Sequence, residues 1–128
     1  MKKLVSLLLV LVLVVSLAAP AMALTAEPKT KSRTNTFAGS QYTATVSASF
    51  SSANASLAYK KVANLSVQLV AHTYSSVLGD SGTDRIDSDV ATDVDVSAYV
   101  TAGSGQHITE AIGYYIISGS SLTPLNVK

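Results

Sequence analysis

The fold class of this 128-residue chain is decided by one stretch, Gln41-Tyr42-Thr43-Ala44-Thr45-Val46-Ser47-Ala48-Ser49-Phe50-Ser51. Every second residue from Tyr42 to Phe50 is apolar, and the residues between them are Thr or Ser. Successive side chains of a strand point to opposite faces, so a period of two predicts a half-buried β-strand. One face of this strand enters a core, and the other presents a Thr/Ser ladder to water.

Other segments repeat this alternation on both sides of the first. In residues 65–74 we expect the inward positions to be Leu65, Val67, Leu69 and Ala71. In residues 89–100 the pattern places on one face Val90, Thr92, Val94, Val96, Ala98 and Val100. Residues 108–118 form the most apolar predicted strand, and residues 122–127 predict a short edge strand, because Pro124 fits only an edge or a bulge. Strands separated by turn signals predict an all-β protein, a small antiparallel β-sandwich of about five to seven strands.

Two segments between these strands are less decisive. Residues 53–63 fit a helical spacing of apolar residues and also an alternating one, and we favour a short strand that follows a turn at residues 52–54. Residues 75–88 are rich in Ser, Gly and Asp and predict a loop.

The start of the chain predicts secretion. Lys2 and Lys3 precede an uncharged apolar run, and Ala21-Met22-Ala23 provides a small-x-small cleavage site. We therefore expect residues 1–23 to be a signal peptide, residues 24–36 to be a flexible arm, and residues 37–128 to be the β-sandwich domain. A retained membrane helix is the alternative, but the run dissolves into small residues around Pro20.

Composition excludes several classes of function. The chain has no cysteine, so disulfides, thiol catalysis and thiolate zinc sites are ruled out, as is a lipid anchor on cysteine. Of nine Lys and Arg residues, Lys2 and Lys3 leave with the signal peptide, so seven basic residues face eight acidic ones and the net charge is −1. This balance gives no electrostatic footprint for nucleic acid or for an anionic membrane surface.

Candidate chemistry centres on one acidic region. Asp80, Asp84 and Asp87 provide carboxylates for a weak calcium site, although their spacing matches no EF-hand loop. Residues 79–82 spell Gly-Asp-Ser-Gly, as around the nucleophile of chymotrypsin-like proteases, but His72 precedes Ser81 by only nine residues and no aspartate stands in the required order. We read His72 and His107 as surface histidines, and no cofactor other than calcium is indicated.

The resulting expectation is a small secreted, non-enzymatic β-sandwich protein that acts as a surface or extracellular interaction or structural module. Its partner is a protein, a cell surface or a second copy of itself. The texture of alternating Ser, Ala, Val and Thr is similar to that of small secreted β-rich proteins of Gram-positive bacteria. A secreted, bacteriocin-like antagonist toxin is the alternative, and a small hydrolase that uses the Asp80 region is a weaker third hypothesis.

Overall fold

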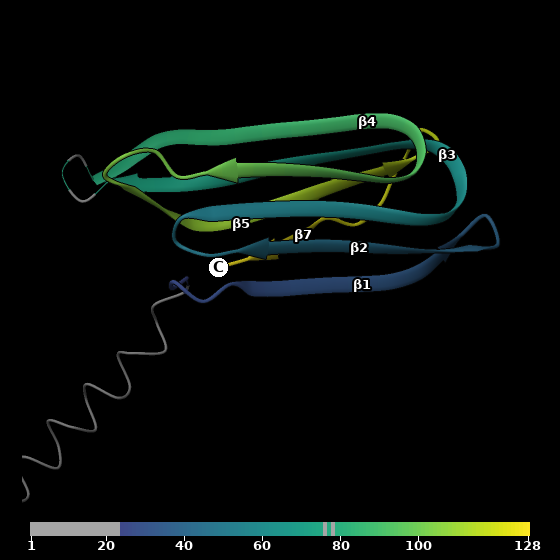
Figure 1. The fold of residues 1–128 in the computed structure, drawn as a ribbon, viewed down its shortest axis with the longest axis horizontal. Helices are drawn as coiled ribbons and strands as arrows, with labels where there is room; N and C mark the ends of the chain where they lie inside the picture. Colours follow the sequence, from purple (N-terminus) through teal and green to yellow (C-terminus); the bar gives the residue numbers. More distant parts are fainter. Residues whose placement is uncertain (1–23, 76, 78) are drawn as a thin grey trace, which may run out of the picture.

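One curled antiparallel sheet makes up the protein (Figure 1). The computed structural model describes residues 24–75, 77 and 79–128, with the backbone alone for residues 79–83. Its strands are β1 (Lys29–Phe37), β2 (Ser40–Ala48), β3 (Ser52–Ser75), β4 (Gly79–Thr101), β5 (Gln106–Ile117), β6 (Ser120–Ser121) and β7 (Leu125–Val127). The sheet order is β1-β2-β3-β5-β6, with β4 also paired to β3 and β7 to β5. The all-β prediction is confirmed, and the seven strands lie within the expected number. The expected signal peptide, residues 1–23, lies outside the described residues.

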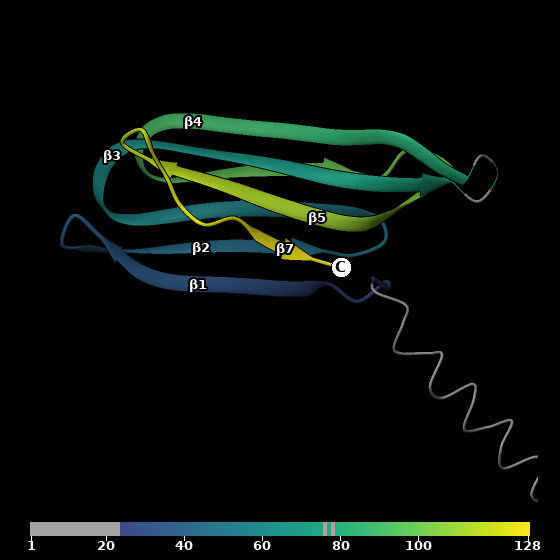
Figure 2. The ribbon, with the colours of Figure 1, turned by 180° about the vertical axis from the view of Figure 1, so that it is seen from behind.

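The curl arises because β3 and β4 are long enough to run through both halves of the sheet. Residues 52–58 of β3 pair with β2 and with the end of β4, whereas residues 65–75 pair with β5 and with the beginning of β4. Between these parts the register of β3 and β4 shifts, from Ala58 opposite Asp95 to Ala63 opposite Asp93. Irregularities of this kind bend a strand and increase its twist. Both strands turn back at the same end of the molecule, so that one face of the sheet is enclosed (Figures 1 and 2).

Alternating residues build the core as the pattern predicts. Tyr42, Ala44, Val46 and Ala48 of β2 are buried, and so is the predicted inward set of residues 65–71 on β3. Residues 53–63, which the pattern left open between helix and strand, belong to β3 and are strand throughout. A strand is therefore confirmed for these residues, but the expected turn at residues 52–54 is wrong, because β3 already begins at Ser52.

The predicted flexible arm is wrong from Lys29 onward, because Lys29–Phe37 is β1 and pairs with β2 over its full nine residues. Its hydroxyls continue the ladder of β2 across the outer face, with three cross-strand contacts of 3.0 Å: Thr30–Ser47, Ser32–Thr45 and Thr34–Thr43. The inner side of β1 carries Lys29, Lys31 and Arg33, in register with buried residues of β2. Charges replace apolar residues at these positions, so no hydrophobic periodicity marks this strand in the sequence. Inward-pointing charges are a known feature of edge strands.

The predicted loop over residues 75–88 is also wrong. β3 continues to Ser75 and β4 already begins at Gly79, in register with β3. Pairing with a strongly apolar neighbour holds this Ser, Gly and Asp-rich segment in an extended conformation that its composition does not favour.

The predicted inner face of β4 holds for its second half and fails for its first. Val96, Ala98 and Val100 are buried, whereas Val90 is 64% and Val94 is 43% exposed. The register shift opposite Ala58 and Ala63 reverses which side chains of β4 share the face of the core residues of β3. The first half of β4 therefore turns Val90 outward.

Tyr115 joins the two halves of the curl across the interior. It is 1% exposed, and its hydroxyl donates a hydrogen bond to the carbonyl oxygen of Thr45 at 2.7 Å. Thr45 lies on β2, which is not a neighbour of β5 in the sheet. Gly113 leaves the space that the Tyr115 ring occupies, because a Cβ on Gly113 would lie 2.6 Å from Cζ of the ring and closer still to its hydroxyl.

We expect Tyr115→Phe to change stability differently at neutral and alkaline pH. At pH 7 the variant loses one buried hydrogen bond, which costs about 1 kcal/mol. Burial raises the pKa of Tyr115 well above its usual value, and the nearby Arg33 partly offsets this. The unfolded chain then loses the phenolic proton first, so the wild type loses about 1.4 kcal/mol per pH unit above pH 10.

Urea unfolding at pH 7 and pH 11 tests this expectation. The stability gap between wild type and Tyr115→Phe should close by pH 11, and Tyr114→Phe, which removes a hydroxyl from an exposed ring, is the matched control. A gap that stays constant with pH would contradict the role assigned to burial of the hydroxyl.

Candidate functional site

The three predicted calcium ligands do not form one site in the part of the chain that the structure describes. Asp84 and Asp87 are three residues apart on a regular stretch of β4, so their side chains point to opposite faces. Asp84 Oδ1 lies 2.8 Å from His72 Nδ1, and Asp87 Oδ2 accepts a hydrogen bond from the Tyr99 N–H at 2.9 Å. The side chain of Asp80 lies outside the description. Among the described residues there is no group of three His, Cys, Asp or Glu side chains that could hold a metal ion.

Both histidines lie near the surface in partnerships with their neighbours. His72 lies on β3, in register with Asp84 of β4 on one side and with Glu110 of β5 on the other. Its side chain is 38% exposed and that of Asp84 is 44% exposed. His107 packs against Phe50 and Tyr74, with ring centroids 5.5 and 5.3 Å away. An ion pair as exposed as His72–Asp84 contributes at most about 1 kcal/mol to stability.

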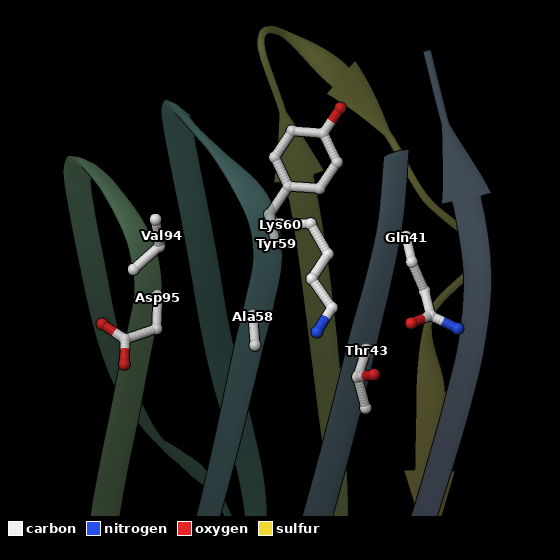
Figure 3. A pocket seen from close by; sticks show the side chains of 7 residues that line it. All are labelled: Gln41, Thr43, Ala58, Tyr59, Lys60, Val94 and Asp95. Atoms are coloured by element: carbon white, nitrogen blue, oxygen red, sulfur yellow. The ribbon is translucent and has the colours of Figure 1, made fainter. Parts of the chain in front are cut away.

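A shallow pocket of about 290 Å³ lies where β3 and β4 bend (Figure 3). It is lined by Gln41, Thr43, Ala58, Tyr59, Lys60, Val94 and Asp95. The small Ala58 stands in one cross-strand row between the longer side chains of Thr43 and Asp95, which leaves a hollow. An amide, a hydroxyl, an ammonium and a carboxylate around one hollow can hydrogen-bond a small polar ligand. Its volume is at the lower end of the range of ligand sites, about 300–1,000 Å³.

A larger feature is an exposed apolar surface on the outer side of the β4–β3–β5 half. We call it the apolar face, and its members are Val70, Ile86, Val90, Ile112, Tyr114 and Ile116. Ile86, Val70 and Ile112 form one continuous row across the three strands. Ile86 is 58%, Val90 64% and Tyr114 40% exposed. Monomeric proteins seldom leave contiguous apolar surface of this kind uncovered unless it binds something.

Sequence reasoning missed the apolar face because only β5 is apolar on both of its faces, whereas β3 and β4 add isolated apolar residues among polar ones. On β5, Tyr115 and Ile117 are buried while Ile112, Tyr114 and Ile116 are on the other side. The apolar character of residues 108–118 was visible in the sequence, and Val70 is an apolar residue at an outward position between Leu69 and Ala71. The signal that would have revealed the face is the coincidence of both on neighbouring strands.

Comparison with known proteins adds no assignment. No protein-family model matches the chain, and no curated protein matches it in sequence. A similar solved structure is described as "X-ray structure of Northeast Structural Genomics Consortium target SoR45", at 7% sequence identity and a TM-score of 0.25, over 79% of this chain and 83% of that chain. A likeness this weak carries no argument about fold or function. In the described part of the chain no helix has the length and apolar character needed to cross a membrane.

Proposed function

We propose that this protein is a secreted, non-enzymatic interaction module that associates with a second copy of itself through the apolar face. The proposal includes a sandwich arrangement in which the two halves of the curled sheet act as facing layers. Secretion is supported by the basic start, the apolar run and Ala21-Met22-Ala23. N-terminal sequencing of the extracellular protein, with Leu24 as the expected first residue, tests that part.

The row of Ile86, Val70 and Ile112, in which Ile86 is 58% exposed and the other two are half-buried, is the observation that carries the proposal. Full burial of one exposed isoleucine side chain stabilises a protein–protein contact by about 1.5–3 kcal/mol. A face that meets its own copy across a two-fold axis buries each residue twice.

Charge favours a second copy as the occupant. With residues 1–23 removed, seven basic residues face eight acidic ones, so two copies hardly repel each other. Proteins with a net charge near zero associate more readily than strongly charged ones. The members of the apolar face carry no charge, and the charged row of Asp84, His72 and Glu110 lies beside them on the same side of the sheet.

We expect Ile86→Asp to weaken self-association by at least about tenfold, because the lost burial exceeds about 1.4 kcal/mol. Light scattering coupled to size-exclusion chromatography, over a wide range of protein concentration, measures this. Thr36→Asp is the matched control, since it adds the same charge at an exposed position of β1. A wild type that is monomeric at every concentration, or two variants that behave alike, would overturn the proposal.

A further inference from the structure

Two aspartates of β4 bind the backbone of the same strand across the fold. Asp89 Oδ2 accepts a hydrogen bond from the Ser97 N–H at 3.1 Å, and Asp87 Oδ2 accepts one from the Tyr99 N–H at 2.9 Å. The donors belong to the second half of β4 and the acceptors to its first half. The two halves meet because β4 turns back on itself together with β3 (Figures 1 and 2).

These hydrogen bonds involve backbone N–H groups on the side of β4 that does not pair with β3. In the described sheet β4 pairs with β3 along one side. A strand directs alternate N–H groups to its two sides, and Ser97 and Tyr99 are two residues apart. Their N–H groups are therefore those that a further strand would use, and exposed groups of this kind are templates for edge-to-edge pairing.

Side chains do not fill the space beside the Asp89–Ser97 bond. A hollow of about 380 Å³ lies between the two halves of β4. It is lined by Ser56, Leu57, Ala58, Asp89, Ala91, Asp93, Asp95, Val96 and Ser97. The two halves of β4 are therefore bridged by two carboxylate hydrogen bonds, one of which lies next to an open hollow.

We propose that Asp87 and Asp89 form a latch that holds the two halves of β4 together and withholds this edge from strand pairing with a second copy. An ionised carboxylate accepts hydrogen bonds and donates none, so it satisfies an edge N–H without extending the ladder. Such charge-assisted bonds are roughly twice as strong as neutral ones. The latch leaves the apolar face, on the opposite side of the β4–β3–β5 half, as the surface for association.

The test uses the Ile86→Asp chain as background, so that association through the apolar face does not contribute. Hydrogen exchange of the Ser97 and Tyr99 amides and the molar mass in solution are both measured. In Asp87→Ala/Asp89→Ala we expect the two amides to exchange at least about tenfold faster, given the 1.5–3 kcal/mol of a hydrogen bond to a charged group. We also expect the variant to form dimers or larger species through the freed edge.

Asp87→Asn/Asp89→Asn is the matched control, because it removes the same two charges and keeps one acceptor oxygen at each position. It should stay monomeric and retain part of the protection, because a neutral acceptor forms a weaker hydrogen bond than an ionised one. Unchanged exchange and a monomeric mass in the alanine variant would overturn the latch. Equal association of the asparagine and alanine variants would also overturn it, because charge repulsion alone would then protect the edge.

Single substitutions keep the test decisive if the double alanine variant does not fold. Asp89→Ala should expose the Ser97 amide, with the Tyr99 amide as an internal reference, and Asp87→Ala should do the reverse. Equal acceleration at both amides in both single variants would indicate general loosening and contradict the latch. The exchange measurement does not depend on self-association, so a monomeric wild type would reject the proposed function and leave this test intact.

Discussion

Gly113→Ala should lower the free energy of unfolding by about 3 kcal/mol, although it adds a single methyl group. The new Cβ would lie 2.6 Å from Cζ of Tyr115, which is 1% exposed and has no free space to enter. Overpacking of a core costs about 1–3 kcal/mol. A ring that moves aside also loses its hydrogen bond to the Thr45 carbonyl, the contact that joins β5 to β2 across the interior.

A double-mutant cycle with Tyr115→Leu identifies the cause. The cost of Gly113→Ala, measured by urea unfolding, should fall well below 3 kcal/mol in the Tyr115→Leu background, because the clashing hydroxyl and ring edge are gone. If alanine costs the same in both backgrounds, the Tyr115 ring does not explain the glycine.

Strands with one apolar and one polar face could be predicted from the sequence. β2 alternates strictly and the second part of β3 does so except at Val70, and the structure buries the inward apolar positions of both. Burial of one face and exposure of the other is a local consequence of the two-residue period, so the sequence contains it without any knowledge of the neighbours. The same logic correctly favoured a strand for residues 53–63.

The strands at the sheet edges could not be predicted, because the residues that suit an edge depend on the topology of the whole sheet. β1 turns Lys29, Lys31 and Arg33 toward the inner side, and the first half of β4 does the same with Arg85, Asp87 and Asp89. Charged residues at inward positions remove the alternation of apolar and polar residues by which a strand is recognised in a sequence. The exposed position of Val90 depends on a register shift in β3, which no local pattern records.

These inward-facing charged residues form hydrogen bonds at the two open sides of the curled sheet, the β1 side and the β4 side. On one side Lys29 donates to the carbonyl oxygen of Lys128 at 3.3 Å, and Arg33 donates to that of Thr123. On the other side Asp87 and Asp89 accept from backbone N–H groups of β4. At the β1 side, therefore, cationic side chains donate hydrogen bonds to carbonyl oxygens. At the β4 side, carboxylates accept hydrogen bonds from backbone N–H groups. Asp87, one of the three residues that indicated a calcium site, accepts a hydrogen bond from the Tyr99 N–H.

The core of the curled sheet is built from residues of unequal size on its two sides. The half formed by β2 and residues 52–58 of β3 contributes mostly alanines: Ala44, Ala48, Ala53 and Ala55. Leu57 is the large aliphatic side chain of this part of β3, and it is 0% exposed. Its cross-strand neighbours are the smaller Ala44 and Val96, which cannot expand into space that it vacates.

Leu57→Ala should therefore cost about 3–4 kcal/mol, because an alanine-rich wall cannot collapse onto the cavity. Total stability for a domain of this size is about 5–15 kcal/mol, so the loss is a large fraction of it. Val62→Ala is the control on the same strand, since Val62 is 68% exposed and its truncation should change stability by less than about 0.5 kcal/mol. Urea unfolding of both variants measures the difference. A cost for Leu57→Ala near 1 kcal/mol would contradict this expectation. It would mean that the two halves of the curled sheet move together and fill the cavity.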